Sequence, residues 1–139
     1  MKRMLTVPVL GLLFAASLAF ADTAPPVTVK TLITTTKTDI GQPLVLPKHD
    51  PELIVSTYDI APGAKLARHE HPFSRSAYVL QGDIAVQFDD GSQKRYHAGD
   101  VIVEAVGTWH FGMNVGTQPV RLVVIDLVEA GKPATVLAK

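Results

Sequence analysis

The 139-residue sequence contains no cysteine, which excludes disulfide bonds as a source of stability. It also lacks a run of basic residues, and its 13 Lys and Arg balance 13 Asp and Glu, so we expect no nucleic-acid partner. Aromatic residues are scarce at 6%, but hydrophobic residues reach 47% and charged residues 19%, a composition too apolar for a disordered chain. The length predicts a single domain.

The first residues have the pattern of an export signal. Lys2 and Arg3 precede an uncharged, largely apolar stretch, and residues 19–21 (Ala-Phe-Ala) supply the small residues that a signal peptidase prefers. We therefore expect a signal peptide over residues 1–21, cleavage after Ala21, a periplasmic or secreted protein, and no stable membrane association afterwards. The alternative is an uncleaved membrane anchor, although the stretch has barely the length to span a bilayer and contains Pro8.

Strand signals dominate the rest of the chain, and no stretch shows helical periodicity. β-branched residues favour a strand over residues 27–36, and a proline-punctuated stretch follows it. Further strands are expected over residues 52–63, on both sides of a turn at Gly82 and, after a hairpin at 89–91, over 119–131. Short strands separated by turns at intervals of roughly eight to twelve residues are typical of an all-β sandwich or barrel.

Two histidines, His69 and His71, stand two positions apart in an expected strand. Side chains at i and i+2 project from the same face of a strand, so both imidazoles can reach one metal ion. Such a pair also arises by chance, and the alternative is two surface histidines or two hydrogen-bonded core histidines. His49 and His97 match no pattern and are expected on the surface or in loops.

The glycines and histidines around this pair form two spaced motifs. The first reads G-x5-H-x-H and is followed by a further glycine, the second reads G-x7-G-x2-H-x3-N, and the matching residues are Gly63, His69, His71, Gly82, Gly99, Gly107, His110 and Asn114. This pattern resembles the cupin superfamily. The resemblance implies an all-β, jelly-roll barrel in which His69, His71 and His110 point inward as metal ligands.

The resemblance also divides the chain into segments. We expect a cupin barrel over residues 50–128, preceded by an N-terminal strand and proline-rich lead-in over 22–49 and followed by a C-terminal tail over 129–139. Cupins often pair through an edge strand. A homodimer is therefore expected, formed through residues 31–36 or 122–128.

Two residues depart from the family pattern. Arg75 stands where the family has a metal-binding glutamate, and a guanidinium has no lone pair with which to bind a cation. An inward Arg75 would orient an anionic group of a substrate, whereas an Arg75 at the barrel rim would be solvated. Glu104 precedes Ala105, which occupies the position of a common family proline, and Glu104 either replaces the missing ligand or faces solvent.

Three imidazoles would leave two or three coordination positions open on a divalent transition metal, and iron, manganese, zinc, copper and nickel all accept such ligands. Because three-histidine cupins include iron-dependent dioxygenases, the resemblance implies a dioxygenase-like oxidoreductase of a small, anionic organic molecule. Arg75 would orient that molecule, and Tyr78 would line its pocket. The alternatives are a non-catalytic cupin that binds or senses a metal or small ligand, and a structural barrel without metal.

Overall fold

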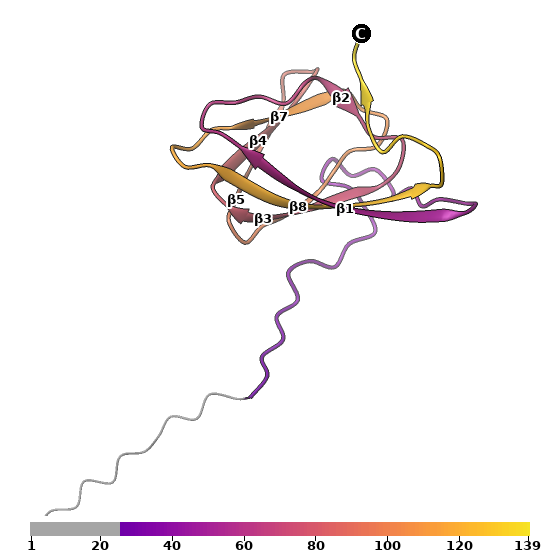
Figure 1. Ribbon diagram of the computed structural model, residues 1–139, viewed down its shortest axis with the longest axis horizontal. Coiled ribbons are helices and arrows are strands. Elements are labelled where there is room, and N and C mark those ends of the chain that lie inside the picture. The colour runs from indigo at the N-terminus through magenta and orange to yellow at the C-terminus, as the bar shows by residue number, and fades with distance from the viewer. Residues whose placement is uncertain (1–25) are drawn as a thin grey trace, which may run out of the picture. The chain divides into compact units, whose positions relative to one another are not determined.

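The structure of the chain is a computed structural model that describes residues 26–139, so the expected signal peptide lies outside the described residues (Figure 1). Residues Thr31–Lys139 form one compact unit. This part of the chain contains nine β-strands. No helix long and apolar enough to cross a membrane is found in residues 26–139.

The strands form two antiparallel sheets, and together they make the all-β jelly-roll expected from the sequence. The four-stranded sheet has the order β1 (Pro51–Ile60), β8 (Val120–Glu129), β3 (Arg75–Gln81), β6 (Val101–Val103). The five-stranded sheet has the order β5 (Gln93–His97), β4 (Asp83–Phe88), β7 (His110–Asn114), β2 (His69–Glu70), β9 (Val136–Leu137). In Figure 1 the two sheets enclose the space between β8 and β7.

The inner faces of the sheets supply the hydrophobic core. In β8, buried residues alternate with more exposed ones from Val120 to Val128, as expected for a strand with one face turned inward. Buried side chains of both sheets, among them Val79, Ile84 and Ile102, meet in one cluster. Phe88 belongs to this cluster, and its ring lies 5.8 Å from the ring of His110. The histidine region therefore packs directly against the core.

The expected turn at Gly82 joins β3 to β4. Gly82 has a φ of 82°, and a Cβ atom at this position would lie 2.7 Å from the carbonyl oxygen of Pro119. Only glycine combines a positive φ with so close an approach of neighbouring backbone. The strands expected over residues 52–63 and 119–131 are also present, as β1 and β8.

The strand expected over residues 27–36 is wrong, because this segment has no assigned strand and its Val27 and Val29 side chains are exposed. β-branched residues favour extended backbone, but a strand also needs a hydrogen-bonding partner and a surface on which to pack. None of the paired strands in the described residues includes this segment.

Two further expectations change in the structure. Residues 122–128 lie in β8, which pairs with β1 on one side and β3 on the other, so the expected dimer contact through an edge of this strand is wrong. The C-terminal tail over residues 129–139 contains β9, which pairs with β2 beside His69. The tail is thus part of the five-stranded sheet, next to the candidate site.

Candidate metal centre

Three histidines from two neighbouring strands and the loop after one of them converge inside the barrel. His69 in β2 lies directly opposite His110 in β7, and His71 follows β2. One ring nitrogen from each histidine lies within 4.8 Å of the other two, and all three residues are buried. The ring centroids of His69 and His110 are 4.5 Å apart, and those of His71 and His110 are 5.1 Å apart. The structure thus brings together the three residues that the two motifs singled out.

Backbone carbonyls orient all three rings in the same way. Each Nδ1 lies within hydrogen-bonding distance of a carbonyl oxygen, which can only accept, so each Nδ1 carries the proton. The three bonds are His69 to Ala67 at 2.7 Å, His71 to Ala134 at 3.0 Å and His110 to Thr108 at 2.7 Å. In the neutral rings, the lone pair that a metal ligand requires is therefore on Nε2, and that of His71 lies 3.5 Å from Nη1 of Arg75.

Glu104, which immediately follows β6, reaches two of the three histidines. A carboxylate oxygen lies 3.0 Å from Nε2 of His110 and 3.9 Å from Nε2 of His71, and the side chain is only 13% exposed. Glu104 immediately follows β6, and its neighbours Val103 and Ala105 are buried as well, so its inward position follows from these contacts and not from strand alternation. Of the two alternatives for Glu104, the solvent-facing one is therefore wrong.

The protonation of the site is uneven. Burial lowers the pKa of His69, and it lowers the pKa of His71 to about 4, so both rings are neutral at neutral pH. Burial also disfavours the charged form of His110, but the adjacent Glu104 carboxylate outweighs it and raises the pKa of His110. Burial works against the Glu104 carboxylate, yet His110 and His71 keep the pKa of Glu104 below its usual range.

The donor set fits a transition metal. Nε2 of His110 is buried and has no hydrogen-bond partner of acceptable geometry among the described residues, although Glu104 lies close to it. A buried nitrogen of this kind costs free energy unless something binds it. Three imidazoles and one carboxylate suit iron, manganese, zinc, copper or nickel rather than calcium or magnesium, which prefer oxygen ligands.

Arg75 lies inside the barrel, not at its rim. Its side chain is 5% exposed, and Nε and Nη2 donate to the two carboxylate oxygens of Asp126 at 2.6 and 3.1 Å. Nη2 also donates to the hydroxyl of Thr135 at 2.9 Å, and Nη1 lies 3.5 Å from Nε2 of His71. The rim alternative is therefore wrong, and the inward Arg75 is paired with Asp126 instead of standing free for an anionic group of a substrate.

Asp126 is a site residue that the sequence reasoning missed. It lies opposite Arg75 in the register of β3 and β8. The alternation along β8 could have indicated it, because Asp126 lies on the same face as Leu122 and Val124, and that buried face is otherwise apolar. A carboxylate at a core position of a strand requires a buried partner.

Tyr78 does not line the site. Along β3, Arg75 and Val79 are buried, whereas Tyr78 occupies the alternate, less buried set that faces away from the barrel interior. Tyr58 in β1 packs against the core instead and lies beside His69. Tyr58 has the parity of buried Ile60, a signal that the sequence contained.

The remaining histidines lie away from the site, as expected. His49 is exposed, and the side chain of His97 is 69% exposed and contacts Asp83. Trp109 and Phe111 flank His110 and are only partly buried, whereas His110 is fully buried.

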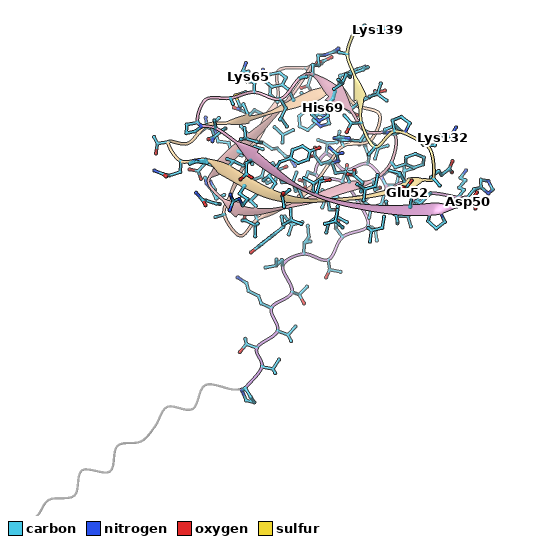
Figure 2. The ribbon with its side chains drawn as sticks, viewed as in Figure 1. Asp50, Glu52, Lys65, His69, Lys132 and Lys139 are labelled. Atoms are coloured by element: carbon cyan, nitrogen blue, oxygen red, sulfur yellow. The ribbon has the colours of Figure 1, made fainter. Side chains whose placement is uncertain are left out.

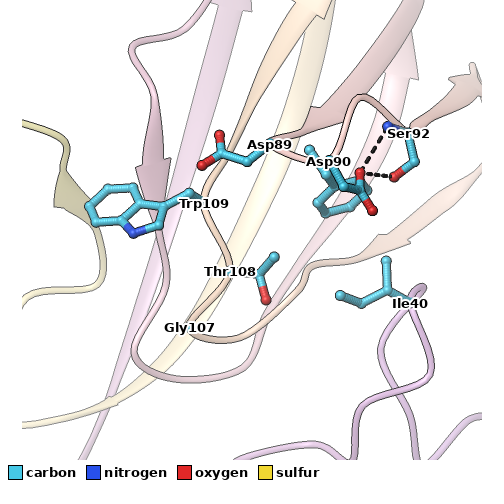
Figure 3. Close-up of a pocket in the computed structure, with 8 residues that line it drawn as sticks. Ile40, Asp89, Asp90, Ser92, Gly107, Thr108 and Trp109 are labelled. Carbon is cyan, nitrogen blue, oxygen red and sulfur yellow. Dashed lines mark hydrogen bonds between the residues drawn. The ribbon is translucent and has the colours of Figure 1, made fainter.

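An open hollow of about 630 Å³ is lined by residues that include Ile40, Asp89, Asp90 and Trp109 (Figure 3). Its acidic residues are already engaged, since Asp89 forms an ion pair with Arg68 and Asp90 accepts hydrogen bonds from Ser92. None of the three clustered histidines lines it. This hollow is therefore separate from the metal centre.

Comparison with solved structures agrees with the architecture. An uncharacterized conserved protein with a double-stranded beta-helix domain from Klebsiella pneumoniae is 26% identical, with a TM-score of 0.53 and coverage of 70% of this chain and 82% of that chain. An oxalate oxidase in complex with the substrate analogue glycolate is also 26% identical, with a TM-score of 0.52 and coverage of 62% of this chain and 46% of that chain. The polyketide cyclase RemF from Streptomyces resistomycificus is 20% identical, with a TM-score of 0.53 and coverage of 66% and 65%, and shares the fold.

No curated protein matches the sequence. The family model for the Cupin domain matches residues 56–126, a span that begins in β1 and ends in β8. The span includes His69, His71 and His110. On the strength of this match and of the jelly-roll barrel, the chain belongs to the cupin family.

Proposed function

We propose that this cupin binds one divalent transition metal through Nε2 of His69, His71 and His110, with the Glu104 carboxylate as a fourth ligand. The observation that carries the proposal is the convergence of one ring nitrogen from each of three buried histidines, all within 4.8 Å of one another, with a Glu104 carboxylate oxygen 3.0 Å from Nε2 of His110. The Nδ1 protons support it, because they place the lone pair of each neutral ring on Nε2.

In this proposal the carboxylate ligand comes from the second motif instead of the first. Arg75 stands at the family position for the glutamate, and its charge is neutralised by Asp126. Glu104 then supplies the one negative charge next to the histidines. With a divalent ion, the centre keeps a net positive charge of about one, which favours an anionic head group on an incoming molecule.

We propose further that the protein is a dioxygenase-like oxidoreductase of a small organic molecule. The open coordination positions of the centre and the similarity to an oxalate oxidase, at 26% identity, support this activity. The metal, when bound, would supply a redox-active Lewis acid at which the substrate and dioxygen meet. The chain itself holds the imidazoles in place through Ala67, Thr108 and Ala134, and the buried ring of His110 packs against that of Phe88.

Elemental analysis of the purified protein tests the metal site. We expect close to one transition metal per chain, loss of it in His110→Ala, and at least tenfold weaker binding in Glu104→Gln. His97→Ala is the matched control, because His97 is 69% exposed and lies outside the site. Equal metal content in all four proteins would overturn the site.

Oxygen uptake with a panel of small carboxylates, phenols and diketones then tests the activity. If the metal-loaded protein consumes no oxygen with any of them, the oxidoreductase proposal fails and the protein is a non-catalytic binding cupin.

The chain is also proposed to form a homodimer through the outer face of β1 and β8. Leu53 and Val55 are 64% and 59% exposed, and Ile125, which lies opposite Val55, is 43% exposed. A second copy that covers this apolar face would remove it from water. Light scattering after gel filtration should give twice the chain mass, with Val55→Lys shifted toward the monomer and Leu46→Lys unchanged.

Export remains our proposal for the first residues. Cleavage after Ala21 predicts a mature chain that starts at Asp22. The mass of the protein recovered from periplasm or medium tests this, and an intact Met1 in those fractions would contradict it.

A further inference from the structure

A small cavity adjoins the metal centre. It has a volume of about 140 Å³ and is lined by Tyr58, Leu66, Ala67, His69, Thr135 and Leu137. Its surface is mostly carbon, with His69 as the shared residue between cavity and centre. Figure 2 shows His69 beside the C-terminal strand that forms one side of this cavity.

The C-terminal segment builds that side and also orients the histidines. Leu137 pairs with His69 across β9 and β2, and the amide of Ala138 donates to the carbonyl of Arg68 at 3.0 Å. Within the same segment, the Ala134 carbonyl accepts the Nδ1 proton of His71. The wall that bears Thr135 and Leu137 is therefore held in register with the metal ligands.

None of the described residues that line the cavity is an aspartate, glutamate, lysine or arginine. The nearby guanidinium of Arg75 donates to Asp126 and to the Thr135 hydroxyl, and its Nη1 lies 3.5 Å from Nε2 of His71. A charged group in the cavity would therefore lose hydration without meeting an oppositely charged side chain on the cavity lining. Leu137, by contrast, is 61% exposed, and an apolar occupant would cover it.

We propose that this cavity binds an uncharged, apolar group about the size of a benzene ring, on a molecule whose polar head reaches the metal. A cavity of roughly 150 Å³ lined by apolar side chains accommodates benzene, which sets the size of the occupant. The inference rests on the proposed metal site, and it narrows the substrate class from any small anion to one with an aryl or branched alkyl tail. The head group is then recognised by the metal and the tail by Tyr58, Leu66 and Leu137.

Two hydroxamates distinguish the contribution of the head group to binding from that of the tail. Acetohydroxamate and benzohydroxamate carry the same metal-chelating head, but only the second has a ring for the cavity. Calorimetric titration of the metal-loaded full chain should give a Kd for benzohydroxamate at least tenfold lower. Leu137→Asp should abolish this ratio and leave the Kd of acetohydroxamate within threefold of wild type. Leu46→Asp is the matched control, because Leu46 is 60% exposed and does not line the cavity.

The outcomes distinguish the two proposals. If acetohydroxamate binds but the ratio is near one, or if Leu137→Asp leaves the ratio intact, the cavity proposal is overturned and the metal site stands. If neither hydroxamate binds the metal-treated protein, the metal site fails, and the cavity is tested by itself with benzene and the metal-free chain. Saturation-transfer NMR should then detect benzene with wild type and Leu46→Asp but not with Leu137→Asp, and equal signals in all three would overturn the cavity as well.

Discussion

The buried pair of Arg75 and Asp126 allows a prediction with a definite magnitude. Both side chains are 5% exposed, and the guanidinium donates to both carboxylate oxygens. Asp126→Asn leaves the charge of Arg75 buried without its counter-charge, which costs about 3–5 kcal/mol of unfolding free energy. With a urea m-value of about 1–3 kcal/mol/M for a chain of this size, the unfolding midpoint should fall by roughly 2 M.

The double variant Arg75→Met/Asp126→Leu tests whether the loss of stability in Asp126→Asn comes from the unpaired charge or from a change in packing. It removes both charges and keeps apolar bulk, so its stability should return to wild type within about 1 kcal/mol or exceed it. Unfolding in urea can be followed by the fluorescence of Trp109, the single tryptophan.

An exposed pair provides the control for this experiment. Arg121 and Asp59 lie opposite each other in β8 and β1, with Nε 2.7 Å from a carboxylate oxygen, but their side chains are 56% and 59% exposed. Asp59→Asn should cost less than about 1 kcal/mol. If Asp126→Asn were no more destabilising than Asp59→Asn, or if the double variant were as unstable as Asp126→Asn, the account of Arg75 as a neutralised internal group would be refuted.

Three other predictions follow from the same structure. Zinc binding should release protons, because Glu104 raises the pKa of His110 and this ligand must be deprotonated; calorimetry in buffers of different ionisation enthalpy should show less proton release in Glu104→Gln than in wild type, and equal release would contradict this. The unfolding free energy of the metal-free chain should fall by on the order of 3 kcal/mol between pH 6.5 and 4, because His71 takes up a proton in the unfolded chain at a higher pH than in the folded chain. The urea midpoint of His71→Gln should therefore depend less on pH than that of wild type, and parallel curves would contradict this. Gly82→Ala should destabilise by over about 2 kcal/mol in the same assay, since its Cβ would meet Pro119, whereas a neutral result would refute the required close approach.

Much of the fold and three of the site residues were accessible from sequence. Strand-favouring residues and turn residues predicted β1, β3, β4 and β8. Two positions apart on one strand, His69 and His71 were expected to share a face, which is a local property. His110 was singled out only because the spacing of the second motif resembles that of the cupin superfamily.

Other features depended on contacts between distant parts of the chain. The strand signal over residues 27–36 was not sufficient, because pairing requires a partner that local propensity does not supply. The outward direction of Tyr78 depended on which face of β3 met the core, and the inward direction of Glu104 depended on the path of the chain after β6. Parity relates residues within a strand but does not by itself say which face is inside.

From the sequence by itself came the strand-rich character of the chain and the two spaced motifs, and their resemblance to the cupin superfamily implied the barrel and the three inward histidines, which the family match and the structure then showed. Only the tertiary structure decided that Arg75 is neutralised by Asp126 and that the C-terminal strand closes a cavity beside His69. These pairs are joined by sheet register over more than fifty residues of sequence, and register is set by the packing of the whole barrel.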